Sequence, residues 1–206
     1  EDAIAACIER YAAPYCDDIR TDALGNLIAH KAGKSGKRVM LSAHMDQIGL
    51  VVVDIDENGF LRIAPVGGVS PAIAAARQVV FANGVRGVTG WETKSKTAAT
   101  AAMPELFVDI GAADRESAEA RVSVGDMCVF VGDFIDMGDR VACAAMDNRI
   151  ACAVLVEVLR RMQTDHEVYA VFTVQEELGL RGAQAAVYNV KPEVCLLYTS
   201  PSPRDK

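Results

Sequence analysis

Three short stretches of this sequence place imidazole and carboxylate groups where a metal ion could bind. In the first, "SAHMDQIG", His44 and Asp46 stand two residues apart at the end of a predicted strand. Side chains two apart on a strand leave the same face, and an imidazole beside a carboxylate is typical of a metal ligand and the partner that orients it. Taken alone, the pair is also compatible with an incidental surface or capping pair.

The second stretch, "AAMDNRIACAV", puts Asp147 at the N-terminus of a predicted helix. Capping alone would explain an aspartate there, because its side chain accepts hydrogen bonds from free backbone N–H groups. A carboxylate in that place could equally bridge two cations, since both of its oxygens project away from the helix. The residue type and position leave both interpretations open.

The third stretch, "FTVQEELGLRG", carries two adjacent carboxylates, Glu176 and Glu177, after the apolar run "VYAVFTV". They follow the carboxyl end of a predicted strand, which is where open α/β sheets bind ligands. Adjacent carboxylates repel unless a cation or a proton lies between them. One could therefore bind a metal while the other acts as a general base. The alternative is a pair of solvated glutamates in a loop.

The elements that position these residues predict an α/β fold with a mixed central sheet flanked by helices, interrupted by a β-barrel-like insert. Strands are predicted for "KRVMLSAHMD" and for the continuous apolar run "EVYAVFTV", which is typical of a central strand. Between about residues 70 and 141, short strands alternate with Gly/Asp turns, as in a barrel or sandwich. The helix that starts at Asp147 carries apolar residues on two predicted buried faces, namely Ile150, Val154, Val158, Leu155, Leu159 and Met162.

The predicted domain organisation is therefore discontinuous. We expect residues 1–66 and 143–197 to form the two segments of a catalytic domain and residues 67–142 to form the β-rich insert. Residues 198–206 follow an abrupt change to Ser, Pro and charged residues and are interpreted as a non-native tail. The chain starts with Glu1 inside a helix-like pattern, so we expect it to be truncated at both ends.

Composition narrows the classes of function. The net charge of −7 argues against non-specific nucleic-acid binding, which needs clustered positive charge. No apolar run has the length needed to span a membrane, and no signal-peptide pattern is present. The six cysteines are scattered without a C-x-x-C pair, which favours reduced thiols and a cytoplasmic protein.

Taken in order, the three motifs match a two-metal hydrolase, and their nitrogen and oxygen donors suit zinc or cobalt, with manganese possible. The chain resembles the dinuclear-metal aminopeptidase family that contains glutamyl aminopeptidase and the tetrahedral, dodecameric (deblocking) aminopeptidases. The resemblance runs from about Asp22 to Val194. It is carried by "DALGNLIAHKAG", "LSAHMDQIGLVVVDIDENGFLRIAPVGGVSP", "AAMDNRIACAVLVEVLRRM" and "VYAVFTVQEELGLRGAQAA".

The resemblance implies a role for each motif residue. His44 would bind one metal with Asp46 orienting it, and Asp147 would bridge two divalent ions. Glu177 would be a further metal ligand, and Glu176 would be the general base that takes a proton from water. The substrates would be peptides, which lose their N-terminal residues. The insert would be a dimerisation domain that helps to build a homo-oligomer, from a dimer up to a dodecamer.

The resemblance also implies ligands that this sequence does not carry. In the family, the strand corresponding to "EVCLL" ends in a metal-binding Asp, and a His further along completes the other metal's ligands. Here that strand continues as "YTSPSPRDK". The remaining histidines, His30 and His166, lie outside the motifs and are interpreted as surface residues. We therefore predict weak metal binding and little or no peptidase activity for the chain as it stands.

Two other functions are compatible with the sequence. The chain could be a non-catalytic oligomerisation or scaffold module that keeps the motifs by descent. It could also be a dinuclear amidohydrolase acting on acylated small molecules or glycans. Metal content and activity towards aminoacyl-nitroanilides, acyl amino acids and β-glucans would separate these alternatives from an aminopeptidase.

Overall fold

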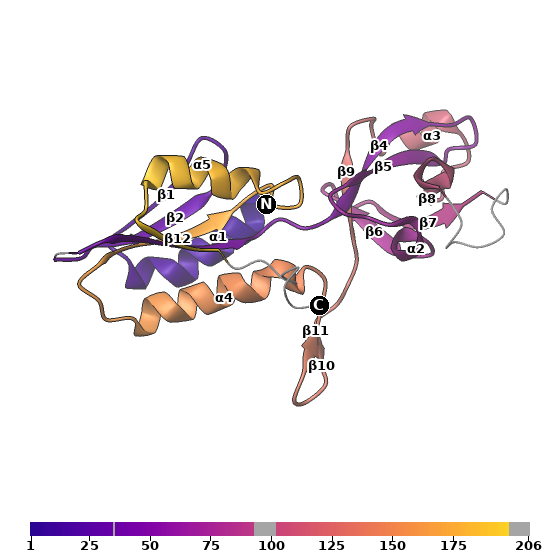
Figure 1. Ribbon diagram of the computed structural model, residues 1–206. Helices are drawn as coiled ribbons and strands as arrows, with labels where there is room; N and C mark the ends of the chain where they lie inside the picture. Colours follow the sequence, from indigo (N-terminus) through magenta and orange to yellow (C-terminus); the bar gives the residue numbers. More distant parts are fainter. Residues whose placement is uncertain (35, 93–101, 198–206) are drawn as a thin grey trace. The chain divides into compact units, whose positions relative to one another are not determined.

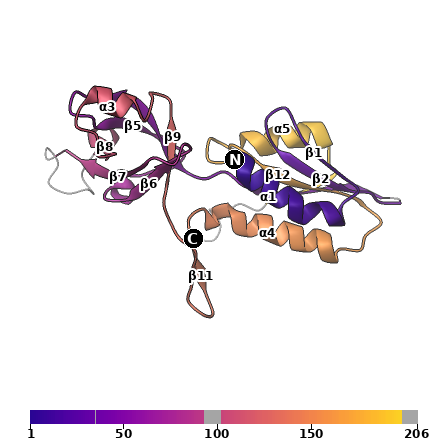
Figure 2. The ribbon, with the colours of Figure 1, turned by 180° about the vertical axis from the view of Figure 1, so that it is seen from behind.

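A computed structural model describes residues 1–34, 36–92 and 102–197 of the chain, so the tail predicted at 198–206 lies outside it. The chain divides into two compact units. An α/β unit comprises Glu1–Gln47 and Ala145–Lys206, and a barrel unit comprises Ile48–Ala144. Figures 1 and 2 show the two units, with the barrel inserted between the two segments of the α/β unit.

The α/β unit is built on a five-stranded sheet. Its order is β1 (Asp18–Thr21), β2 (Leu27–Lys31), β12 (Glu167–Thr173), β3 (Arg38–His44) and β13 (Val194–Leu197). The central strand β12 runs parallel to β3 and antiparallel to β2, and β13 runs parallel to β3. The predicted mixed sheet with "EVYAVFTV" at its centre is therefore confirmed.

Helices cover both faces of this sheet (Figure 1). They are α1 (Asp2–Ala12), followed by the short 3-10 helix η1 (Ala13–Tyr15), then α4 (Met146–Arg161) and α5 (Arg181–Val190). Ala170 and Phe172 of β12 pack in the core with α1 and α4, whereas Val171 between them packs with α5. Because successive side chains of a strand point to opposite faces, burial on both faces explains the unbroken apolar run.

Helix α4 buries one face rather than the two that its apolar pattern predicts. Leu155 and Leu159 are buried against the sheet, but Ile150 and Val154 remain 47% and 53% exposed. The sheet and α1 pack on one side of α4, so the side that carries Ile150 and Val154 is left exposed within this unit. None of the described helices combines the length and the apolar character needed to cross a bilayer.

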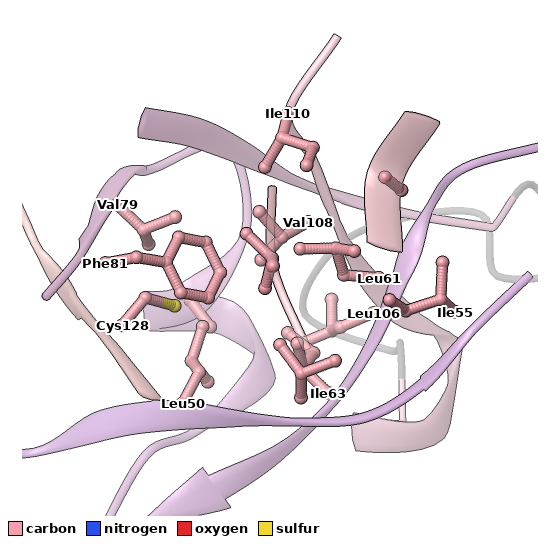
Figure 3. Close-up of a cluster of buried hydrophobic side chains, with 14 of the residues drawn as sticks. Leu50, Ile55, Leu61, Ile63, Val79, Phe81, Leu106, Val108, Ile110 and Cys128 are labelled. Atoms are coloured by element: carbon pink, nitrogen blue, oxygen red, sulfur yellow. The ribbon is translucent and has the colours of Figure 1, made fainter. Parts of the chain in front are cut away.

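The insert is a closed six-stranded barrel with its own apolar core (Figure 3). Its strands, in order around the barrel, are β4 (Gly49–Ile55), β5 (Leu61–Val66), β8 (Leu106–Asp109), β7 (Arg86–Trp91), β6 (Gln78–Phe81) and β9 (Met127–Phe130). Shorter elements of the same unit are α2 (Pro71–Ala74), η3 (Met103–Glu105), α3 (Arg115–Glu119), β10 (Ile135–Asp136) and β11 (Val141–Ala142).

The predicted boundary between residues 66 and 67 is wrong, because the β4–β5 hairpin belongs to the barrel. Strand β4 pairs with β9 through Leu50↔Cys128 and Val51↔Met127, which closes the barrel, and β5 pairs with β8. The divisions fall instead after Gln47 and after Ala144. The sequence identifies the hairpin from its turn, but local pattern does not say which sheet a hairpin joins.

Candidate metal centre

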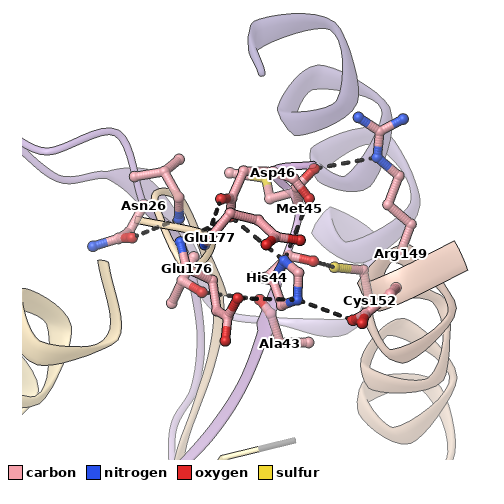
Figure 4. Close-up of polar contacts among 12 residues, drawn as sticks. Asn26, Ala43, His44, Met45, Asp46, Arg149, Cys152, Glu176 and Glu177 are labelled. Atoms are coloured by element: carbon pink, nitrogen blue, oxygen red, sulfur yellow. Dashed lines mark hydrogen bonds and ion pairs between the residues drawn. The ribbon is translucent and has the colours of Figure 1, made fainter. Parts of the chain in front are cut away.

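The candidate centre lies at the carboxyl ends of two parallel neighbouring strands. In the register of β3 and β12, Thr173 pairs with His44, the last residue of β3. The chain leaves these strands into Asp46 on one side and into Glu176 and Glu177 on the other. Parallel pairing therefore brings two motifs that are about 130 residues apart to one edge of the sheet, as Figure 4 shows.

His44 is buried, with only 2% of its side chain exposed, and its two ring nitrogens face different groups. Nδ1 lies 3.3 Å from the backbone oxygen of Asp46 and 3.5 Å from its carboxylate Oδ1. Nε2 lies 3.2 Å from Oδ1 of Asp147 and 3.7 Å from Oε2 of Glu176. One nitrogen is thus available to a cation while the other is held, as in histidines that ligate metals.

The carboxylate of Asp46 does more than orient the imidazole. Its Oδ1 accepts a hydrogen bond from the backbone N–H of Glu176, and its Oδ2 accepts one from that of Glu177, both at 3.1 Å. Asp46 is itself buried. A single side chain therefore fixes the histidine and both glutamates relative to one another.

Three ligand atoms meet in this place. One atom each from His44, Glu176 and Glu177 lies within 4.8 Å of the others, and within residues 1–34, 36–92 and 102–197 this is the only such group of three or more His, Cys, Asp or Glu residues. Asp147 joins it through its contact with His44. Imidazole nitrogen with carboxylate oxygen is a donor set that fits zinc and related divalent ions.

The electrostatics of the cluster also fit a cation. Burial by itself would lower the pKa of His44, but the hydrogen bond to Asp46 and the charges of Glu176, Asp46 and Asp147 outweigh it and raise that pKa to about 9. Burial, with the charge of Glu176, raises the pKa of Glu177. The surrounding carboxylates therefore favour a proton on His44 in the absence of metal. A metal ion bound here would supply that positive charge instead.

Asp147 differs from the other members in its surroundings. Its side chain is 49% exposed, and its backbone (φ −81°, ψ 106°) is not helical although it lies within α4. Asn148 is also non-helical, so regular helix begins after it. The prediction that Asp147 stands at the start of the helix is therefore confirmed, and its carboxylate contacts His44.

Two residues of α4 that the sequence analysis did not single out hydrogen-bond to the backbone at the end of β3, next to the candidate centre. The Cys152 thiol donates to the backbone oxygen of His44 at 3.2 Å, and Nε of Arg149 donates to that of Met45 at 3.2 Å. Burial raises the pKa of the Cys152 thiol to about 12, so it serves as a hydrogen-bond donor and not as a reactive thiolate. The only signal in the sequence was their place in "DNRIACAV".

The two other histidines do not join the cluster. His166 is exposed, as predicted. The surface interpretation of His30 is wrong: its side chain is 19% exposed, its Nε2 lies 2.5 Å from Oε2 of Glu167, and its ring stacks on Tyr169. His30 lies on the internal strand β2, between β1 and β12. Its side-chain partners both lie on β12, far along the chain, so local pattern could not indicate them.

The family profile described as M42 glutamyl aminopeptidase matches residues 25–198, a span that includes all five motif residues. This chain belongs to the M42 glutamyl aminopeptidase family. The resemblance stated from the motifs is thereby confirmed.

Individual relatives agree with this family assignment and with the fold described above. A provisionally named aminopeptidase of Acetivibrio thermocellus is 47% identical over 181 residues, covering 87% of this chain and 54% of that protein. A solved structure of an aminopeptidase from the archaeon Desulfurococcus kamchatkensis superposes with a TM-score of 0.89 at 32% identity, covering 98% of this chain and 59% of that one. The predicted α/β fold with a barrel insert is therefore confirmed.

A third relative is described by its assembly. The Pyrococcus horikoshii TET1 peptidase, which can assemble into a tetrahedron or a large octahedral shell, superposes with a TM-score of 0.85 at 30% identity, covering 96% of this chain and 63% of that one. The chain spans about half the length of the curated relatives it matches.

Proposed function

We propose that this chain carries part of the catalytic centre of a metal-dependent aminopeptidase that removes N-terminal residues from peptides. The observation that carries the proposal is the convergence of His44 Nε2 with carboxylates of Asp147 and Glu176 at 3.2 and 3.7 Å. This convergence occurs at the carboxyl ends of two parallel strands, in a chain of an aminopeptidase family. Nothing in the described residues favours a scaffold module or an amidohydrolase over this function.

His44, Asp147 and Glu177 would hold the divalent metal ions. Zinc or cobalt suits these donors best, and manganese is a third possibility. When bound, such ions would polarise the scissile carbonyl and make water more acidic. Asp46 holds Nδ1 of His44, which leaves Nε2 facing Asp147 and Glu176 and would leave it free to bind a metal ion.

Glu176 would act as the general base. Its Oε2 faces the same space as His44 Nε2, and with 21% of its side chain exposed it can reach both water and substrate. The carboxylate takes a proton from the attacking water and passes it to the leaving amine. The hydrogen bond from its backbone N–H to Asp46 holds the main chain of Glu176 in place beside His44.

We further propose that metal binding by this chain alone is weak and that its peptidase activity is low. In the described ranges, the cluster of three donors and the neighbouring Asp147 leave few ligands for two ions. Removing one ligand or its orienting partner typically costs about 10–100-fold in affinity. Tight binding of two metal ions per chain would contradict this part of the proposal.

The barrel unit is proposed to act in self-association, giving a homo-oligomer as in the TET1 peptidase that this chain resembles. All six cysteines are unpaired, which supports a reducing compartment such as the cytoplasm. Size-exclusion chromatography with light scattering would test the assembly. A monomer at all concentrations would contradict it.

The decisive experiment for catalysis uses the chain extended to the length of its relatives and loaded with cobalt or zinc. Release of N-terminal residues from a panel of aminoacyl-nitroanilides should fall by about 10²–10⁴-fold in Glu176→Gln, because that change removes the base but keeps its size. Glu9→Gln, an exposed position on α1, is the matched control. Hydrolysis of acyl amino acids or β-glucans instead of the peptide analogues would favour the amidohydrolase.

A further inference from the structure

A buried asparagine outside the metal cluster holds the loop that carries Glu176 and Glu177. Asn26 lies just before β2 and has no exposed surface. We propose that Asn26 is a positioning residue of the candidate metal centre, which fixes both ends of the loop between Val174 and Gly182. This inference rests on the proposed function, because the loop matters only if its carboxylates bind and catalyse.

The side chain of Asn26 reaches both ends of the loop at once. Its Oδ1 accepts a hydrogen bond from the backbone N–H of Val174 at 3.1 Å (Figure 4). Its Nδ2 donates to the backbone oxygen of Gly182 at 3.0 Å. Val174 precedes the two glutamates and Gly182 lies in the first turn of α5. One planar amide therefore sets the distance between the end of β12 and the start of α5.

The loop needs such a support because its backbone is unfavourable. Gln175 (φ 55°) and Leu180 (φ 61°) are non-glycine residues in the left-handed region, where the side chain crowds the backbone. Residues of this kind persist when their surroundings over-determine the conformation. At Gly182, a Cβ atom would lie 2.1 Å from the Val174 oxygen and 2.5 Å from Oδ1 of Asn26, so the start of α5 packs directly on this support.

Asp22 in turn fixes the orientation of the asparagine. Its Oδ2 accepts from Nδ2 of Asn26 at 2.8 Å, and its Oδ1 accepts from the backbone N–H groups of Leu24, Gly25 and Asn26. The amide of Asn26 therefore has its donor side saturated by Asp22 and Gly182 and its acceptor directed at Val174. It cannot rotate by half a turn without setting like groups against one another.

The loop is consequently held from two directions. Asp46 binds the backbone N–H groups of Glu176 and Glu177 in the middle, and Asn26 binds the two ends. Loss of the second support should let the carboxylates drift relative to His44 while the sheet stays folded. Displaced carboxylates in a folded sheet would distinguish a positioning role of Asn26 from a purely structural one.

The test uses Asn26→Asp, which keeps the size and the acceptor for Val174 but puts a carboxylate oxygen where Nδ2 faced Gly182 and Asp22. Cobalt titration followed by visible absorption should show affinity about 10-fold weaker for the folded protein, with an altered spectrum. Hydrogen exchange of the Glu177 amide should speed up, because the end of the loop at Gly182 is no longer held. Asn58→Asp, an exposed change of equal charge in the barrel, is the control.

A paired variant isolates the contact with Gly182. In Asp22→Asn/Asn26→Asp the hydrogen bond between residues 22 and 26 can re-form with reversed polarity, but the carboxylate still faces the Gly182 oxygen. Cobalt affinity should stay below wild type. Full recovery would overturn the inference, because the turn at 22–26 would then be all that matters.

Two further outcomes keep the inference separate from folding and from the proposed function. If Asn26→Asp does not fold, Asn26→Ala replaces it, because it removes both contacts with the loop. Unchanged cobalt affinity with unchanged exchange at Val174 would then overturn the inference. If wild type and Glu177→Gln bind cobalt equally, the metal proposal fails, and exchange at Val174 and Glu177 alone decides whether Asn26 holds the loop.

Discussion

The two units of this protein bury very different side chains. Every strand of the barrel pairs with two neighbours around a purely apolar core, and its one buried polar residue among those described is Thr89. The α/β unit buries all the others in the described ranges, including Asn26, His44 and Asp46. Burying polar groups lowers stability unless each finds a partner. The α/β unit therefore carries this cost at the candidate metal centre, whereas the barrel core does not.

The largest effect on stability should come from a change that opens a cavity in the apolar core of the barrel. Leu61→Ala, at a position with no exposed surface in the barrel core, should lower the free energy of unfolding of the barrel by about 3–5 kcal/mol through lost burial and a residual cavity. Cobalt binding by the α/β unit should persist. Urea denaturation monitored at Trp91, which lies on β7, measures the first quantity.

Val53→Ala is the control for that prediction, because Val53 is 51% exposed on β4 and its truncation should change stability little. Equal losses of stability in the two variants would mean that the barrel core is not the source of its stability.

The polar side of the comparison should respond to pH. Because the pKa of His44 is raised from 6.5 to about 9 in the folded, metal-free protein, its contribution to stability is complete below about pH 6.5 and is lost as the pH rises through about 9. The loss should amount to about 3 kcal/mol at most. Thermal unfolding of the chelator-treated protein across this range measures it.

His44→Gln provides the reference, since it should flatten the pH dependence between about 6.5 and 9. Cobalt should reverse the trend in the wild type, because the metal binds the unprotonated imidazole and so gains affinity as the pH rises. A metal-free protein that becomes more stable on going from pH 6.5 to 9 would contradict the assigned surroundings of His44.

A smaller effect is expected from removing a single ligand. Glu177→Gln should weaken cobalt binding by about 10–100-fold, because it keeps the shape of the side chain but removes the charge that His44 and Glu176 face. Isothermal titration of the chain with cobalt measures the change. Glu57→Gln, an exposed position in the barrel hairpin, should bind as the wild type does.

Much of the difference between the barrel and the α/β unit could be predicted from the sequence. Alternation and turn signals predicted the barrel strands, and the position of Glu176 after an apolar strand predicted its place at the sheet edge, because strand ends are set by local pattern. The predicted domain boundary after residue 66 was wrong, since the pairing of β4 with β9 depends on residues far along the chain. The predicted surface location of His30 was wrong for the same reason, because its partner Glu167 lies on another strand.

The supporting contacts of the candidate site were the part that the sequence could not predict. Asn26 lies within "DALGNLIAHKAG", and nothing in that stretch indicates that its amide bonds to Val174 and Gly182, which are about 150 residues away. The Cys152 thiol likewise meets the His44 oxygen only because α4 packs on β3. Motifs identify groups that do chemistry, whereas the residues that hold them are set by tertiary contacts.

The smallest predicted effect lies on β3 itself, beside the candidate centre. The hydroxyl of Ser42 is buried and has no hydrogen-bond partner among the described residues. Ser42→Ala should therefore raise the stability of the α/β unit by about 1 kcal/mol, because it removes an unsatisfied polar group without opening a large cavity. Thr173→Val, which removes a buried hydroxyl that does donate to the Ala43 oxygen, should lower the stability of the α/β unit by about the same amount.

Chemical denaturation measures the change in the free energy of unfolding for both variants. Changes of opposite sign would show that the buried polar residues of this unit are stabilising only where each has a partner. Two changes of the same sign would break that distinction.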